Sequence, residues 1–427
     1  MAHSRAMSNH DLATLFFLQM AVILGACRLT GWVMARLGQS QVVSEMIAGV
    51  LLGPSLLGWL APDWSQALFP ASTTPVLYVV AQIGLVLYMF VVGCEFDLQQ
   101  LRQRAGAAAT VSIAGIAAPF ALGGLLAFWL VGQPGFFGSG VSEPMAILFL
   151  GAAMSITAFP MLARIIHEQG LARTSLGTLA LASGAIDDAV AWGVLAIVLA
   201  SLRQDAAVAY LALGGGLGYA LICLTLIRHA LRPLGRAVEI GGLQAGQLVG
   251  VLMLVMLGAW FTDHIQIYAV FGAFIMGLAM PRGRLTETLQ ARIEPVTRSL
   301  LLPVFFTYSG LHTQLLRVNE SSLWAIALLV LVAAVAGKGL ACYAAARWHG
   351  YPPRESLAVG TLMNARGLME LIILNIGLQA GIITPTLFTI MVLMAVVTTL
   401  MASPVFRRLY PPATPADQPT PAEPTRL

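Results

Sequence analysis

An all-helical membrane protein with about thirteen spanning helices is predicted by three features of the sequence. Of the 427 residues, 58% are hydrophobic and 10% are charged, with a mean hydropathy of +0.83, whereas a soluble domain carries roughly 25% charged residues. Apolar runs of about 20 residues, the length needed to cross a bilayer, follow one another along most of the chain. Arginines gather in every second loop between these runs.

The apolar runs divide the chain into consecutive candidate spans. The first follows a short polar segment without a small-residue cleavage site, so it predicts a retained helix and not a signal peptide. We expect residues 1–410 to form one membrane domain and the Pro- and Thr-rich residues 411–427 to form a disordered cytoplasmic tail without a nucleotide-binding regulatory domain. The predicted spans are 12–35, 42–60, 76–95, 106–131, 145–167, 174–202, 207–230, 243–262, 264–281, 295–316, 322–347, 354–380 and 384–406.

The arginine distribution predicts an outer N-terminus and a cytoplasmic C-terminus in the inner (plasma) membrane. In this orientation the outer loops hold only Arg203 and Arg317, and the odd number of spans puts Arg407 and Arg408 inside. The net charge of +4 is therefore interpreted as topogenic. No basic patch is interleaved with aromatic residues, so we expect membrane lipids and no nucleic acid as partners.

Two segments resemble one another. Residues 90–102 read FVVGCEFDLQQLR, and residues 305–317, seven spans later, read FFTYSGLHTQLLR. Because seven is odd, the two copies would be inverted in the membrane, as in many transporters that bind substrate at interrupted helices near the midplane. The alternative is chance similarity between glycine-rich packing surfaces. The repeat predicts that the fifth and twelfth spans correspond.

Both corresponding spans carry residues that interrupt helices. The fifth contains Ser155, Thr157 and Pro160, and a proline removes a backbone donor and clashes with the preceding turn. Polar side chains then satisfy the freed backbone groups. We therefore expect two discontinuous helices that cross; an ordinary kink at Pro160 is the alternative.

The twelfth span contains Asn364, Arg366, Gly367 and Glu370. Arg366 and Glu370 are spaced i, i+4, so they are expected to pair on one helix face. Two interpretations stay open for this pair, which either braces a broken helix or lines the ion path.

Asp187 and Asp188 lie near the middle of the sixth span. A carboxylate at this depth costs about 2.5–3.5 kcal/mol on insertion scales, so two in succession indicate function. Adjacent helical residues point about 100° apart. One aspartate is therefore expected to meet a fixed partner while the other faces a water-filled cavity.

The partner is expected to be Lys338, the only lysine in the chain, in the middle of the eleventh span. A buried lysine can lose its proton, whereas an arginine keeps it. This points to a chemical requirement for an amine and not to a plain structural ion pair. Glu45 and Glu95 lie near span ends, where charged side chains reach the interface at low cost; Glu45 is a weak candidate for the site.

Taken together, several motifs resemble the monovalent cation:proton antiporter-2 family over residues 40–380. The motifs are SQVVSEMIAGVLLGPSLLG, GLVLYMFVVGCEFDLQQLR, SITAFPMLARII, SGAIDDAVAW, FGAFIMGLAMP, PVFFTYSGLHT and MNARGLMELIILNIG. The last two are more similar to the plant cation/H+ exchanger branch, which often has Asn-Asp in place of Asp-Asp. The resemblance therefore leaves ion selectivity open.

The resemblance implies an antiporter fold, a homodimer and an elevator-like movement. Core helices would lie at about 76–202 and 295–406, and dimerisation helices at about 12–60 and 207–281. Asp188 corresponds to the cation- and proton-binding aspartate, and is thus the expected metal ligand. Asp187 corresponds to the neighbour that pairs with a lysine in electrogenic members, at the place of Lys338.

The sequence thus predicts a secondary antiporter, and not an enzyme, that exchanges sodium or potassium for protons by alternating access. Asp188 would bind the cation or the proton, Asp187 with Lys338 would titrate as a unit, and Ser155 and Thr157 would add oxygen ligands for the cation. No cofactor is expected beyond the transported ions. The alternatives are a cation channel, an ion-coupled organic-solute symporter and a non-transporting membrane sensor.

Overall fold

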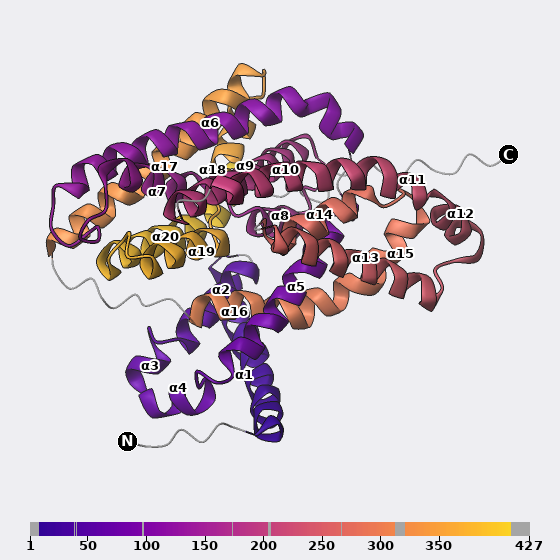
Figure 1. The fold of residues 1–427 in the computed structure, drawn as a ribbon, viewed down its shortest axis with the longest axis horizontal. Coiled ribbons are helices and arrows are strands. Elements are labelled where there is room, and N and C mark those ends of the chain that lie inside the picture. Colours follow the sequence, from indigo (N-terminus) through magenta and orange to yellow (C-terminus); the bar gives the residue numbers. More distant parts are fainter. Residues whose placement is uncertain are drawn as a thin grey trace.

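The computed structural model describes residues 8–37, 39, 41–95, 98–172, 174–203, 206–265, 267–311 and 321–410. Over these residues the protein is all-helical, apart from one isolated bridge between Phe137 and Ile383 (Figure 1). Eight described helices are long and apolar enough to cross a membrane, and shorter apolar helices accompany them. The predicted all-helical polytopic membrane fold is confirmed. The predicted tail, 411–427, lies outside the described residues.

Each predicted span coincides with one helix or with a consecutive group of helices. The first half of the chain contains α1 (Asn9–Arg36), α2 (Gln41–Leu52), α3 (Leu57–Leu60), α4 (Pro62–Leu68), α5 (Thr74–Glu95), α6 (Leu98–Val131), α7 (Glu143–Ser155), α8 (Phe159–Glu168) and α9 (Ser175–Arg203). The second half contains α10 (Ala206–Ile222), η1 (Cys223–Ile227), α11 (Arg228–Ala230), α12 (Arg232–Gly241), α13 (Ala245–His264), α14 (Ala269–Ala279), α15 (Arg284–Val296), η2 (Thr297–Leu301), α16 (Leu302–Leu311), α17 (Ser321–Trp348), α18 (Pro353–Met363), α19 (Leu368–Gln379) and α20 (Pro385–Leu409).

The helices pack into two groups. The core bundle consists of α6, α7, α8, α9, α17, α18, α19 and α20, in which α6 packs against α7, α9 and α17, and α18 packs against α17 and α20. The panel bundle consists of α1, α2, α5, α13, α14, α15, η2 and α16, in which α5 packs against α14 and α2 against α16. Figure 1 shows the two groups side by side, with α10 running along α9.

This packing differs from the grouping expected from the sequence at two helices. The spans at 76–95 and 295–316 were expected among the core helices, but α5 and α16 pack mainly against α14 and α2 of the panel bundle. The physical reason is that these helices are apolar on nearly every side, so their sequences do not indicate which neighbour they meet.

Both predicted helix interruptions are present. The fifth span is split between α7 and α8 by the extended residues 156–158, and Pro160 lies in the first turn of α8. The N–H that proline lacks would have no acceptor within the helix at this position. The twelfth span is split between α18 and α19 by residues 364–367. The two breaks meet, because the Ala158 N–H donates to the Ala365 carbonyl at 3.1 Å.

Two glycines allow neighbouring helices to approach closely around the breaks. A Cβ atom at Gly184 of α9 would lie 2.5 Å from Leu162 of α8, and one at Gly337 of α17 would lie 2.6 Å from Leu122 of α6. The absence of a side chain therefore brings α9 and α17 close to the helices that surround the crossing.

Candidate functional site

The crossing of the two interrupted helices creates an electrostatic problem. The half-helices α7 and α18 both end there, so their last carbonyls carry partial negative charge, while α8 and α19 begin there with partial positive charge. Backbone groups of this kind are costly to leave unsatisfied at membrane depth. The side chains that gather at the crossing are best understood as the partners of these helix ends.

Lys338 of α17 is one such partner and is fully buried. Its ammonium donates to the carbonyls of Gly115, at 2.9 Å, and of Ser155, the last residue of α7. It also contacts Asp187 Oδ2 at 3.0 Å. The three donors of the ammonium therefore each have an acceptor, and the predicted contact between Lys338 and Asp187 is present.

Asp187 receives hydrogen bonds from three elements. Besides Lys338, the Ser112 hydroxyl of α6 donates to Oδ1 at 2.5 Å, and the Thr157 hydroxyl in the first break donates to Oδ2 at 2.6 Å. Only 1% of Asp187 is exposed. Asp187 thus holds α6, α9, α17 and the break between α7 and α8 together.

Arg366 occupies the second break and is another partner of the C-terminal end of α7. Its guanidinium donates to the Met154 carbonyl at 2.7 Å and to the Ala153 carbonyl at 3.4 Å. It lies 3.4 Å from Glu370 in the first turn of α19, and both side chains are buried. The predicted i, i+4 pair is therefore present, and it braces the end of one half-helix against the start of another.

Asn364, the C-terminal cap residue of α18, also serves the backbone. Its amide donates to the Gly360 carbonyl at 2.9 Å. The nearby Arg366 N–H donates to the Thr399 hydroxyl of α20 at 3.1 Å. Side chains therefore satisfy groups that the interruption of α18 would otherwise leave unpaired.

Asp188 lies on a different surface from its neighbour. It faces a cavity of about 510 Å³ between α9 of the core bundle and α5, α14 and α10. The other lining residues are apolar, among them Phe159, Val190 and Phe271. Although Asp188 is only 6% exposed, Val190 beside it is 41% exposed. Asp188 thus lines the cavity, whereas Asp187 contacts Lys338.

The cavity extends along α9 and α14 on both sides of Asp188. Along α9 it reaches from Ala182 to Ile197, and along α14 from Val270 to Leu278. Asp188 therefore lies near the middle of an elongated cavity between these two helices.

Two expected cation ligands lie elsewhere. The hydroxyl of Thr157 contacts Asp187 and the Met363 carbonyl, and the hydroxyl of Ser155 donates to Ala152. The Thr157 hydroxyl therefore supports Asp187 and the Ser155 hydroxyl its own helix, and neither residue lines the cavity beside Asp188. Their expected role as ligands rested on their place in the span, and a break of three extended residues reorients side chains in a way that sequence spacing does not reveal.

Sequence analysis missed Ser112, because a lone serine among apolar residues carries no signal of its partner. It also misplaced Glu45, which is 2% exposed and does not reach the interface. Glu45 lies 3.8 Å from Arg164 of α8. An acidic residue in one apolar helix and an arginine in another were the available signal, since such charges are rarely buried unless paired.

Arg366→Met is expected to reduce stability strongly, since it removes donors from two buried carbonyls and leaves Glu370 without its cation. Breaking a buried pair on one side costs about 3–5 kcal/mol. The measurement is the apparent melting temperature of the purified protein in detergent. Adding Glu370→Gln should recover part of the loss, and a single variant as stable as the wild type would contradict the bracing role.

Comparison with known proteins supports this architecture. A family model described as "Sodium/hydrogen exchanger, transmembrane" matches residues 21–410. The Na+/H+ antiporter NhaS4 of Synechocystis is 43% identical over 91% of this chain and 96% of its own. Cation/H+ antiporter 17 of Arabidopsis thaliana is 34% identical over 93% of this chain, which spans 48% of that relative.

A solved structure has the same fold. The sodium proton antiporter MjNhaP1 from Methanocaldococcus jannaschii superimposes with a TM-score of 0.67, at 16% sequence identity, over 94% of this chain and 96% of its own. At this identity the likeness supports the arrangement of the helices and no residue role.

Proposed function

The chain belongs to the sodium/hydrogen exchanger family and is a cation/proton antiporter, and we propose that Asp188 is the carboxylate for which the cation and the protons compete. The observation that carries this proposal is the division of the aspartate pair: Asp187 is held by three donors, while Asp188 faces the cavity. A carboxylate with access to water binds either a proton or a cation, so occupancy by one excludes the other. The protein is thus a secondary transporter and not an enzyme.

Asp187 and Lys338 are proposed to form a second unit whose proton affinity belongs to the pair. Their contact at 3.0 Å is fully buried, so any change in its protonation alters the charge carried by the core bundle. This unit would make exchange responsive to membrane voltage. Pro160, Asn364, Arg366 and Glu370 act as supports of the crossing.

Alternating access is proposed to occur by movement of the core bundle against the panel bundle. The cavity beside Asp188 lies between α9 of the one and α5 and α14 of the other, so a sliding movement would change the side to which it opens. With the N-terminus outside, Val190 and Ile197 lie on the outer side of Asp188 and are 41% and 44% exposed, whereas Ala182 on its inner side is buried. These exposures support an outward-facing arrangement.

A homodimer in the plasma membrane is proposed, with α1 as part of its contact surface. This helix packs mainly against α2, α16 and α4 and exposes large apolar side chains, including Phe17 and Trp32 at 70% and 59%. Lipid covers whatever the partner does not. The cytoplasmic C-terminus follows from the arginines at the end of α20.

Exchange by the wild type in proteoliposomes tests the proposed function. Sodium, potassium or lithium added to vesicles with an acidic interior should each be tried for dequenching of a pH-sensitive dye, with and without a valinomycin-clamped potential. We expect at least one cation to release protons. Cation flux without proton movement would indicate a channel, and no flux of any kind a membrane sensor. Proton movement that requires an organic solute would indicate a symporter.

A further inference from the structure

Polar contacts between the two bundles gather at one end of the molecule. The panel helix α2 begins here, and the helices α5 and α8 end here. Arg164 of α8 lies 2.8 Å from Glu168 of its own helix and 3.8 Å from Glu45 of α2. The backbone N–H of Gln41 at the start of α2 donates to Glu168 at 2.9 Å. Arg164 is therefore held between carboxylates of both bundles.

Two further links connect the bundles at the same end. His167 of α8 lies 2.5 Å from Glu95, the last residue of α5. The Gln39 amide, between α1 and α2, donates to the Leu400 carbonyl of α20 at 2.9 Å. Each link joins an element of the core bundle to one of the panel bundle. The predicted orientation makes this end cytoplasmic.

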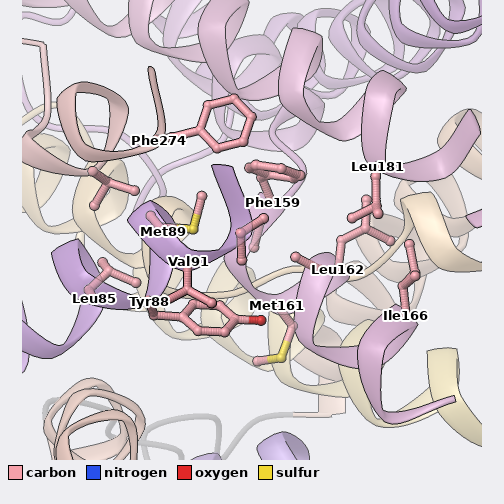
Figure 2. Close-up of a cluster of buried hydrophobic side chains, with 14 of the residues drawn as sticks. Leu85, Tyr88, Met89, Val91, Phe159, Met161, Leu162, Ile166, Leu181 and Phe274 are labelled. Atoms are coloured by element: carbon pink, nitrogen blue, oxygen red, sulfur yellow. The ribbon is translucent and has the colours of Figure 1, made fainter. Parts of the chain in front are cut away.

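Apolar side chains, some of which line the cavity, lie between these links and Asp188. Phe159 of α8 meets Phe274 of α14 edge to face, with ring centroids 5.2 Å apart. Figure 2 shows these rings above Met89 and Tyr88 of α5 and Met161 of α8. Tyr88 and Met161 are each 1% exposed. Buried apolar side chains therefore lie between Asp188 and the polar links.

We propose that Glu45, Arg164 and Glu168 form the inner gate of the transporter, an ion lock that holds the bundles together on the cytoplasmic side while Asp188 faces the outside. The inference rests on the proposed alternating access. For Asp188 to face the cytoplasm, α8 must separate from α2 and α5, and this separation breaks the contacts of Arg164 with Glu45 and of Glu168 with Gln41.

The ion lock can open at low energetic cost. Arg164 is 6% exposed and Glu45 is 2% exposed, so neither is stabilised by bulk water. Among the described residues, Glu45 Oε2 and Arg164 Nη1 have no hydrogen-bond partner, and a buried polar atom in that state is destabilising. Opening to cytoplasmic water relieves this cost, which offsets the loss of the ion pair.

Cysteine accessibility tests the gate without requiring transport. In a background where the four native cysteines are replaced, Met161→Cys reports on the inner path and Val190→Cys on the cavity. The labelling rate with a membrane-impermeant cationic thiol reagent is measured for each reporter. Met161→Cys is labelled in inside-out vesicles, and Val190→Cys is labelled from the outer side of the membrane. Arg164→Gln should raise the labelling rate of the inner reporter about tenfold, because the closed state then holds an uncompensated charge, and should lower that of the outer reporter.

The matched control is Arg298→Gln. Arg298 also pairs with a glutamate one turn away, Glu294 at 2.8 Å, but both lie within the panel bundle. We expect its effect on either reporter to stay below about twofold, as for an ordinary half-exposed pair. Arg164→Lys retains the charge and should return both rates toward the wild type.

Glu45→Gln removes the opposite charge from the other bundle without a change of size, and should act in the same direction as Arg164→Gln. Unchanged labelling in both variants, or an equal rise at both reporters, would overturn the gate. If labelling shifts as expected while the wild type exchanges no cation for protons, the gate stands and the proposed function fails. Normal exchange with no shift in labelling leaves antiport intact and removes the gate.

Discussion

Asp188→Asn is expected to reduce cation/proton exchange to the level of empty vesicles while leaving the protein folded. Asparagine has the size of aspartate but binds no proton and carries no charge, so neither transported species can occupy it. The measurement is cation-induced dequenching of a pH-sensitive dye in vesicles that contain equal amounts of each protein. Substantial retained exchange would remove Asp188 from the mechanism.

The stability of this variant makes the prediction sharper. A charged aspartate at membrane depth costs about 2.5–3.5 kcal/mol on insertion scales, and asparagine avoids this cost. The apparent melting temperature of Asp188→Asn should therefore equal or exceed that of the wild type. Asp188→Glu keeps a carboxylate and should keep measurable exchange. Asp63→Asn, in the short helix α4 away from the cavity, is the matched control and should change neither quantity.

The fold was largely predictable because lipid imposes a simple rule on sequence. A spanning helix must be apolar and about 20 residues long, so the positions of the helices follow from hydropathy. The packing of the helices does not, because an apolar helix presents similar faces to lipid and to protein. For this reason α5 and α16 were expected among the core helices but pack in the panel bundle. The two helix interruptions, next to Pro160 and at Gly367, lie in the spans where they were expected.

The candidate site was predictable where charge was involved. Asp187, Asp188 and Lys338 are costly inside a membrane, so their presence alone indicates function or pairing. Their partners among uncharged groups were not predictable. The carbonyl of Met154 that accepts from Arg366 lies 212 residues away in sequence, and every residue has a carbonyl, so no pattern marks the one that is used.

Lys338→Met is expected to reduce stability more than any substitution of Asp188. The methionine retains length and apolar volume but leaves Asp187, which is 1% exposed, without its cation. Removing one partner of a buried pair costs about 3–5 kcal/mol. The carbonyls of Gly115 and Ser155 lose their donor as well. The melting temperature should fall, and exchange should be impaired even in protein that remains folded.

The double variant Asp187→Asn/Lys338→Met separates stability from coupling to voltage. Both charges are then gone, and replacing a buried ion pair by neutral groups is often nearly neutral for stability, so the melting temperature should recover much of the loss. One of the hydroxyls of Ser112 and Thr157 can still donate to the asparagine carbonyl oxygen, and the other can accept from the asparagine amide. If the pair carries the second titrating unit, the double variant should exchange without response to a valinomycin-clamped potential while Asp188 still binds its ions. A voltage response as large as that of the wild type would assign electrogenicity to another part of the molecule, because no charge would then remain at positions 187 and 338.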